Sequence, residues 1–139
     1  MTFNITEEDI NRRKVLPPGW YICKIARVAN NVVSKSSGAN MTTFDFIVTD
    51  NPANPKCGDG TSSKNVPIKT YYVTEAGIGF ALPLISALLG RSVVAGDSIE
   101  DSVFQNVQGK ELKVYVKNET YQDRISNAAA DFLAMNVVK

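Results

Sequence analysis

Alternation of apolar and polar residues with a period of two is the feature that most limits what this chain can fold into. It is clearest over residues 111–117, where three aliphatic residues alternate with Lys113, Tyr115 and Lys117. Successive side chains of a β-strand point to opposite faces of a sheet, so this pattern predicts a strand with one buried and one outward face. We therefore expect a β-rich fold in which the outward positions are available for binding.

Four further segments carry a strand pattern. They are residues 20–28, 41–49, 66–73 and 124–132, the last of which follows a turn expected at Gln122 and Asp123. The run of three alanines at 128–130 fits a helix as well as a strand, so that segment stays open. In the first two strands the predicted buried positions are Tyr21, Cys23, Ile25, Phe44, Phe46 and Val48.

Helical signals occupy the segments between these strands. A threonine cap followed by three acidic residues predicts a short helix over residues 7–13. A longer helix is expected over 76–89, with an apolar stripe of leucines and Ile85; Pro83 should kink or restart it, and Gly90 should end it. A further short helical segment is expected from 97 to 107.

The order of these elements predicts the fold class. Three strands, a helix and two strands match a five-stranded barrel of the oligonucleotide/oligosaccharide-binding (OB) type, with a helix between strands three and four. The fold is therefore expected to be mainly β with one or two helices. A length of 139 residues suggests one domain. We assign residues 1–18 to an N-terminal arm with a short helix, 19–133 to the barrel domain and 134–139 to a short C-terminal tail.

Composition excludes several classes of function. Histidine is absent, which removes catalytic arrangements built on imidazole and the commonest zinc ligand. Cys23 reads as a core residue and Cys57 as exposed in a Gly/Asp-rich loop; two cysteines are too few for a disulfide framework. With no long apolar run and a polar N-terminus, we expect no membrane association and a location in the cytoplasm, the host's if the chain is phage-encoded.

Signals for catalysis are weak, and we expect no enzyme and no metal or cofactor. Residues 58–64 hold glycine, serine and lysine in the wrong order for a phosphate-binding loop. The acids Asp97, Glu100 and Asp101 lack the spacing of a calcium loop. A nuclease or hydrolase with two metal ions held by carboxylates remains the least favoured alternative, because no acidic residues converge in the sequence.

Lysines and aromatic residues at outward strand positions favour a nucleic-acid interface. Single strands are bound by aromatic rings that stack on bases and by cations that contact phosphates. Net charge is only +1, so any basic surface must be local. The candidates are Trp20, Lys24, Lys35, Lys69, Tyr71, Lys113, Tyr115, Lys117, Tyr121 and Arg124.

Each candidate also has a plain structural interpretation. The outward positions of residues 113–117 fit a solvated strand surface equally well. Trp20 could cover one end of the barrel, against the N-terminal arm. Tyr71 and Tyr72 are adjacent in a strand, so one of the two rings should belong to the core.

Several segments, in their order along the chain, resemble a family of phage-encoded OB-fold proteins that bind single-stranded DNA. The resemblance spans about residues 4–133. It implies sequence-tolerant binding without a cofactor, protection of single strands in phage replication or recombination, and contacts with replication or recombination proteins. The apolar and basic C-terminus differs from the acidic partner-recruiting tail of many such proteins. The segments are 17–21 (PPGWY), 34–41 (SKSSGANM), 87–90 (ALLG), 109–114 (GKELKV) and 119–124 (ETYQDR).

A second hypothesis keeps the fold and changes the function. A virion or assembly protein could use the same barrel as a scaffold for protein interactions, because a fold does not determine a function. The apolar stretch 78–89 would then be an interface. The sequence leaves open the oligomeric state, a dimer included, and the choice between DNA and RNA.

Overall fold

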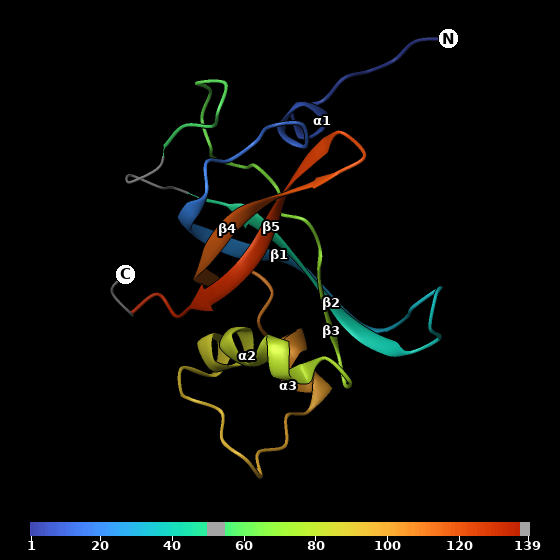
Figure 1. The fold of residues 1–139 in the computed structure, drawn as a ribbon, viewed down its shortest axis with the longest axis vertical. Helices are drawn as coiled ribbons and strands as arrows, with labels where there is room; N and C mark the ends of the chain where they lie inside the picture. Colours follow the sequence, from blue (N-terminus) through green and yellow to red (C-terminus); the bar gives the residue numbers. More distant parts are fainter. Residues whose placement is uncertain (50–54, 137–139) are drawn as a thin grey trace.

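A single antiparallel sheet of five strands dominates the computed structural model, which describes residues 1–49 and 55–136 (Figure 1). The strands are β1 (Gly19–Val33), β2 (Asn40–Val48), β3 (Tyr71–Thr74), β4 (Glu111–Tyr121) and β5 (Arg124–Leu133), in the order β3-β2-β1-β4-β5. The helices are α1 (Glu7–Asn11), η1 (Ile78–Ala81), α2 (Leu82–Leu89) and α3 (Asp101–Gln105). The mainly β class and the placement of the main helix between strands three and four are confirmed.

The sheet remains open between β3 and β5, so the closed barrel expected from the sequence is not established. The segment that precedes β3 partly bridges this opening. On one side the Ile68 N–H donates to the Phe46 carbonyl (2.9 Å), and on the other the Lys69 N–H donates to the Asn127 carbonyl (2.7 Å). These contacts bring a residue of β2 and a residue of the edge strand β5 close to the same segment.

Strand β1 is longer than the sequence predicted. Asn30 and Asn31, expected in a polar connection, belong to the strand, which continues to Val33. The register of β1 against β2 shifts between Ala29 and Val32, and Asn31 has a positive φ of 58°. Asparagine tolerates this conformation, so the pair forms an irregularity within the strand, where a polar dipeptide suggested its end.

Strand β3 is shorter than predicted. Residues 66–70 lie outside it and pair with β2 through an isolated bridge, Ile47 to Pro67. Proline has no N–H to donate, which limits a regular ladder here. Ile68 and Val73 are both buried although they are an odd number of positions apart, five, so the alternation changes parity between them. This change decides which tyrosine of the segment faces the core.

The inner face of the sheet and helix α2 form the core. All six inner positions predicted in β1 and β2 are buried, and so are Leu112, Val114 and Val116 of β4. Pro83 lies in the first turn of α2, so the chain restarts there as a new helix after η1. This restart buries Leu84 and leaves the predicted stripe residue Leu82 39% exposed. Gly90 ends the helix in the left-handed conformation, as predicted.

The β4–β5 hairpin follows the prediction closely. Gln122 and Asp123 form its turn, with φ values of 47° and 63°. The alanines at 128–130 belong to β5, which resolves the ambiguity between helix and strand. The hairpin is longer than expected, because β4 continues to Tyr121.

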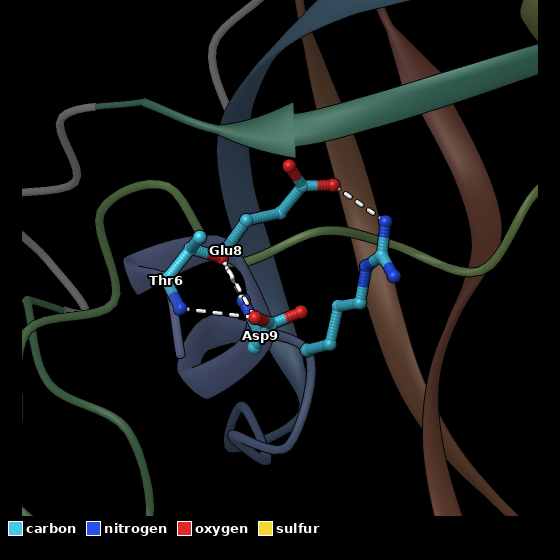
Figure 2. Close-up of polar contacts among 4 residues, drawn as sticks. Thr6, Glu8 and Asp9 are labelled. Carbon is cyan, nitrogen blue, oxygen red and sulfur yellow. Dashed lines mark hydrogen bonds and ion pairs between the residues drawn. The ribbon is translucent and has the colours of Figure 1, made fainter. Parts of the chain in front are cut away.

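The N-terminal arm contains α1, whose first turn is capped as predicted. Thr6 and Asp9 bond reciprocally: each side chain accepts from the other residue's backbone N–H. Arg12, which follows the last helical residue, pairs with Glu8 (Figure 2). No residue of α1 is buried. The helix is therefore stabilised by its cap and its charges, with no burial of a side chain in the core.

After α1 the arm enters the core at Leu16, which is completely buried. The loop that follows the undescribed residues 50–54 packs against the same part of the arm, where the Gly58 N–H donates to the Val15 carbonyl (2.9 Å). Cys57 is consequently 5% exposed, and the expectation of an exposed thiol was wrong. Residues 50–54 of the predicted loop 50–65 and residues 137–139 of the predicted tail lie outside the described residues.

Candidate nucleic-acid interface

Four of the predicted residues meet on the outer surface of two neighbouring strands, which we call the β1–β4 face. Trp20 lies directly opposite Tyr115 in the ladder, Ile22 opposite Lys113, and Lys24 opposite Glu111. Residues two apart in a strand share a face, so Trp20, Lys24, Lys113 and Tyr115 form one group.

The two aromatic rings of this face touch each other. Their centroids are 5.4 Å apart and their planes cross at 74°, an edge-to-face arrangement. Aromatic pairs favour this geometry, in which the positive edge of one ring meets the negative face of the other. Both rings are partly buried. The pair is therefore a fixed aromatic feature within the outer surface of the sheet.

Two lysines share this face with the ring pair, Lys113 beside it and Lys24 farther along β1. Among the described residues none forms an ion pair with Lys24, whose side chain is exposed. Glu111 is its neighbour across the ladder and accepts a hydrogen bond from the Thr49 hydroxyl (3.3 Å). Lys24 thus presents an exposed positive charge with one acidic group close by.

A second group gathers around Glu119. Its carboxylate lies 3.5 Å from the Lys69 ammonium and 3.4 Å from the Lys117 ammonium. Both lysine side chains are about half exposed, so each ion pair is weakened by water and worth little for stability. Glu119 brings the two predicted cations together and at the same time offsets part of their charge.

Tyr121 and Arg124 flank the turn of the β4–β5 hairpin, where they face each other in the ladder. Tyr121 is 74% exposed. Arg124 and Lys69 also line a cleft of about 860 Å³, the α1 cleft, between α1, the segment before β3 and the start of β5. The hairpin thus connects an exposed ring with a cleft that contains cations.

Sequence reasoning missed two arginines of the α1 cleft, Arg12 and Arg27. The register of β1 shifts between Ile25 and Arg27, which turns Arg27 outward opposite Asp45. A strict period of two places residue 27 on the buried face with Ile25, so alternation alone could not find it. The cleft also contains Glu7, Glu8 and Asp45, and its charge is therefore mixed.

The structure separates Lys35 from the other candidates. It lies in the turn between β1 and β2, exposed to solvent, where the Ser34 N–H donates to the Ala39 carbonyl (2.9 Å). The β1–β2 and β4–β5 hairpins project at different ends of the molecule (Figure 1). Lys35 is therefore not part of either group described above.

The prediction that Tyr71 points outward was wrong. Its ring packs edge-to-face on Phe132 of β5, with centroids 5.0 Å apart, and the surrounding burial raises the pKa of its hydroxyl. The change of parity after Ile68 turns Tyr71 inward and leaves Tyr72 53% exposed. Tyr72 is thus the outward tyrosine of this segment.

Across the described ranges 1–49 and 55–136, no three acidic or cysteine side chains cluster closely enough to hold a metal ion. The helices within those ranges are all too short or too polar to cross a bilayer. No model of a known protein family matches the sequence. No curated protein matches it either.

Proposed function

We propose that this protein binds single-stranded DNA on the β1–β4 face, without strong sequence preference. The observation that carries this proposal is the pairing of Trp20 with Tyr115 beside Lys24 and Lys113 on one outer surface. Aromatic rings stack on any base, whereas lysines contact the phosphates that every nucleotide carries. The combination suits a protein that covers exposed strands, as phage replication or recombination requires.

The proposed path of the strand follows β1. From Trp20 the outward positions lead to Lys24 and, beyond the register shift, to Arg27 in the α1 cleft. These seven residue steps span roughly 20 Å at the usual rise of a strand. Lys69 and Arg124 extend the cationic surface at the far end, on the other side of the cleft.

The decisive experiment is a titration with oligo-dT at low and high salt. Trp20 is the chain's one tryptophan, so its fluorescence reports on the proposed site without a label. We expect quenching on binding and an affinity that falls as salt rises, because each phosphate contact releases a counterion. Unchanged fluorescence at low salt, together with no mobility shift of the oligonucleotide, would falsify the proposal.

A matched pair of tyrosine variants locates the site. Tyr115→Ala should weaken binding by roughly 1–3 kcal/mol, the value of one stacked base. Tyr72→Ala removes an exposed tyrosine from β3 and should leave binding unchanged. Equal losses in both variants would place the DNA elsewhere.

A second candidate function, a scaffold for virion or assembly proteins, is favoured by a different observation. Three large apolar side chains of η1 and the start of α2 are open to solvent: Ile78 (41%), Phe80 (87%) and Leu82 (39%). Exposed apolar groups that lie close together are typical of protein interfaces. Light scattering in the absence of DNA distinguishes the candidates, because large assemblies that form without an oligonucleotide favour the scaffold.

A further inference from the structure

The first six residues carry the pattern of a strand but have no partner strand among the described residues. Met1, Phe3 and Ile5 alternate with Thr2, Asn4 and Thr6, and none of the six side chains is charged. The three apolar side chains are 106%, 81% and 77% exposed. In an extended chain they lie on one side, so the segment presents an uncovered apolar edge.

An apolar cleft of about 880 Å³, the α2 cleft, lies between the sheet and the helices. Val73 of β3 and Phe104 of α3 are buried there, while Ile78, Leu82 and Val94 are 41%, 39% and 63% exposed around it. Such an opening into a core is a usual binding place for apolar side chains. Strand β3, which supplies one wall, is also an edge strand of the sheet.

The charge of the residues that line the α2 cleft limits which kind of ligand can bind there. The charged residues that line the α2 cleft are Glu75 and Asp97, with no lysine or arginine among the described lining residues. Arg91 pairs with Asp97 at 3.0 Å, so Glu75 supplies most of the negative charge that disfavours acidic peptides and nucleic acids here. An uncharged segment with alternating apolar side chains has neither this repulsion nor the cost of burying a charge.

Residues 1–6 do not reach the α2 cleft of their own copy. They leave α1 at one end of the molecule and point away from α2, which lies towards the other end (Figure 1). A second copy has no such restriction. Two copies related by a two-fold axis could exchange their segments, so that the same contact forms twice.

We propose that Phe3 and Ile5 of one copy dock in the α2 cleft of a second copy. Each docking removes two large apolar side chains from water and covers the exposed residues around the cleft, which favours association. Adding an extended segment beside an edge strand is a common mode of protein recognition. The proposal is independent of DNA binding, because neither the segment nor the α2 cleft contains a residue of the β1–β4 face.

Light scattering coupled to size exclusion, across a series of concentrations, tests the exchange. The wild-type chain should show twice the mass of one chain, and the double variant Phe3→Asp/Ile5→Asp should show the mass of one chain. Val94→Asp, an exposed position at the cleft, should have the same effect. The control Thr2→Lys/Asn4→Lys places two charges on the opposite side of the segment, of the sign that Glu75 does not repel, and should remain a dimer.

Mixing the two defective variants provides the sharper result. One has an intact cleft and the other an intact segment, so the mixture should regain dimers held by a single contact. Circular dichroism of each variant confirms that the fold is retained. A wild-type monomer at every concentration, a dimer that survives Phe3→Asp/Ile5→Asp, or a mixture that stays monomeric would overturn the proposal.

Discussion

Asn127 and Leu16 are joined across 111 positions of the chain: the Asn127 Oδ1 accepts the Leu16 N–H at 2.9 Å. The Nδ2 of the same side chain donates to the Lys14 carbonyl, also at 2.9 Å. Leu16 itself has no exposed surface, and Asn127 is 7% exposed. One buried side-chain amide thus fastens the N-terminal arm to β5. It also provides hydrogen-bond partners for two backbone groups of the arm that are shielded from water.

Replacing Asn127 should therefore destabilise the whole fold. Asn127→Ala leaves the Leu16 N–H and the Lys14 carbonyl without partners, at a cost of about 2–4 kcal/mol for two buried polar groups. Urea denaturation measures the loss. Asn118, which is exposed and donates to the Leu16 carbonyl (3.0 Å), provides the control. Asn118→Ala should cost about 1 kcal/mol or less, and equal losses would contradict the anchoring role of Asn127.

Glu119 should limit the affinity for DNA under the proposed function. Glu119→Gln removes the carboxylate that pairs with Lys69 and Lys117, so both ammonium groups become available to phosphates. We expect tighter binding of oligo-dT. The slope of log affinity against log salt concentration should become steeper by up to about 0.7 for each lysine that gains a phosphate contact. Glu100→Gln, at an exposed acid before α3, is the control. If Glu119→Gln leaves both quantities unchanged, Lys69 and Lys117 lie outside the DNA path.

Two buried groups should make the protein sensitive to alkali. Burial raises the pKa of the Cys23 thiol from 9.0 to about 12. The pKa of the Tyr21 hydroxyl rises from 10.0 to about 12, first through burial and then through the neighbouring thiols. The unfolded chain thus loses these protons at lower pH than the folded chain. Their contribution to stability is complete below about pH 9 and is lost as the pH rises towards about 12.

Denaturant unfolding from about pH 8 to about pH 11 measures this loss. Cys23→Ala should lower stability at pH 8, because it leaves a small cavity, and should make the decline above pH 9 shallower. The buffer control is the same series at matched ionic strength. A wild-type stability that stays level across the range would show that these groups titrate alike in the folded and unfolded chains.

The sequence predicted the inner face of the sheet well because burial there follows a strict period of two. Phe44, Phe46 and Val48 needed no information beyond their spacing. The same rule placed Trp20 and Tyr115 outward, and the register then set them directly opposite each other. Where the backbone keeps its regular alternation, local pattern and tertiary structure agree.

The errors arose where the alternation changes parity or the partner is distant. The changes of parity around Tyr71 and Arg27 reverse the faces that regular alternation assigns. Asn127 reads as an ordinary polar strand residue, because the backbone groups it binds lie more than 100 positions away. Neither a register shift nor a long-range polar contact leaves a periodic signal in one sequence.

Substitutions in the turn of the β4–β5 hairpin should stabilise the protein without changing its fold. Gln122 and Asp123 both have positive φ, 47° and 63°, which costs roughly 1–2 kcal/mol for a residue with a Cβ. Two-residue hairpins of this kind favour Asn-Gly. Gln122→Asn/Asp123→Gly should therefore raise the free energy of unfolding by about 1 kcal/mol, measured by thermal and urea denaturation.

The reverse substitution in the other hairpin provides the matched control. Gly38 has a φ of 73°, and a Cβ added there would meet no other atom, so Gly38→Ala should destabilise through backbone strain alone. Opposite signs for the two variants would show that left-handed strain is the cause. Because Tyr121 and Arg124 flank the turn, oligo-dT affinity should be measured on the same stabilised variant. Weaker binding in a more stable protein would indicate that the strained turn positions these two side chains for DNA.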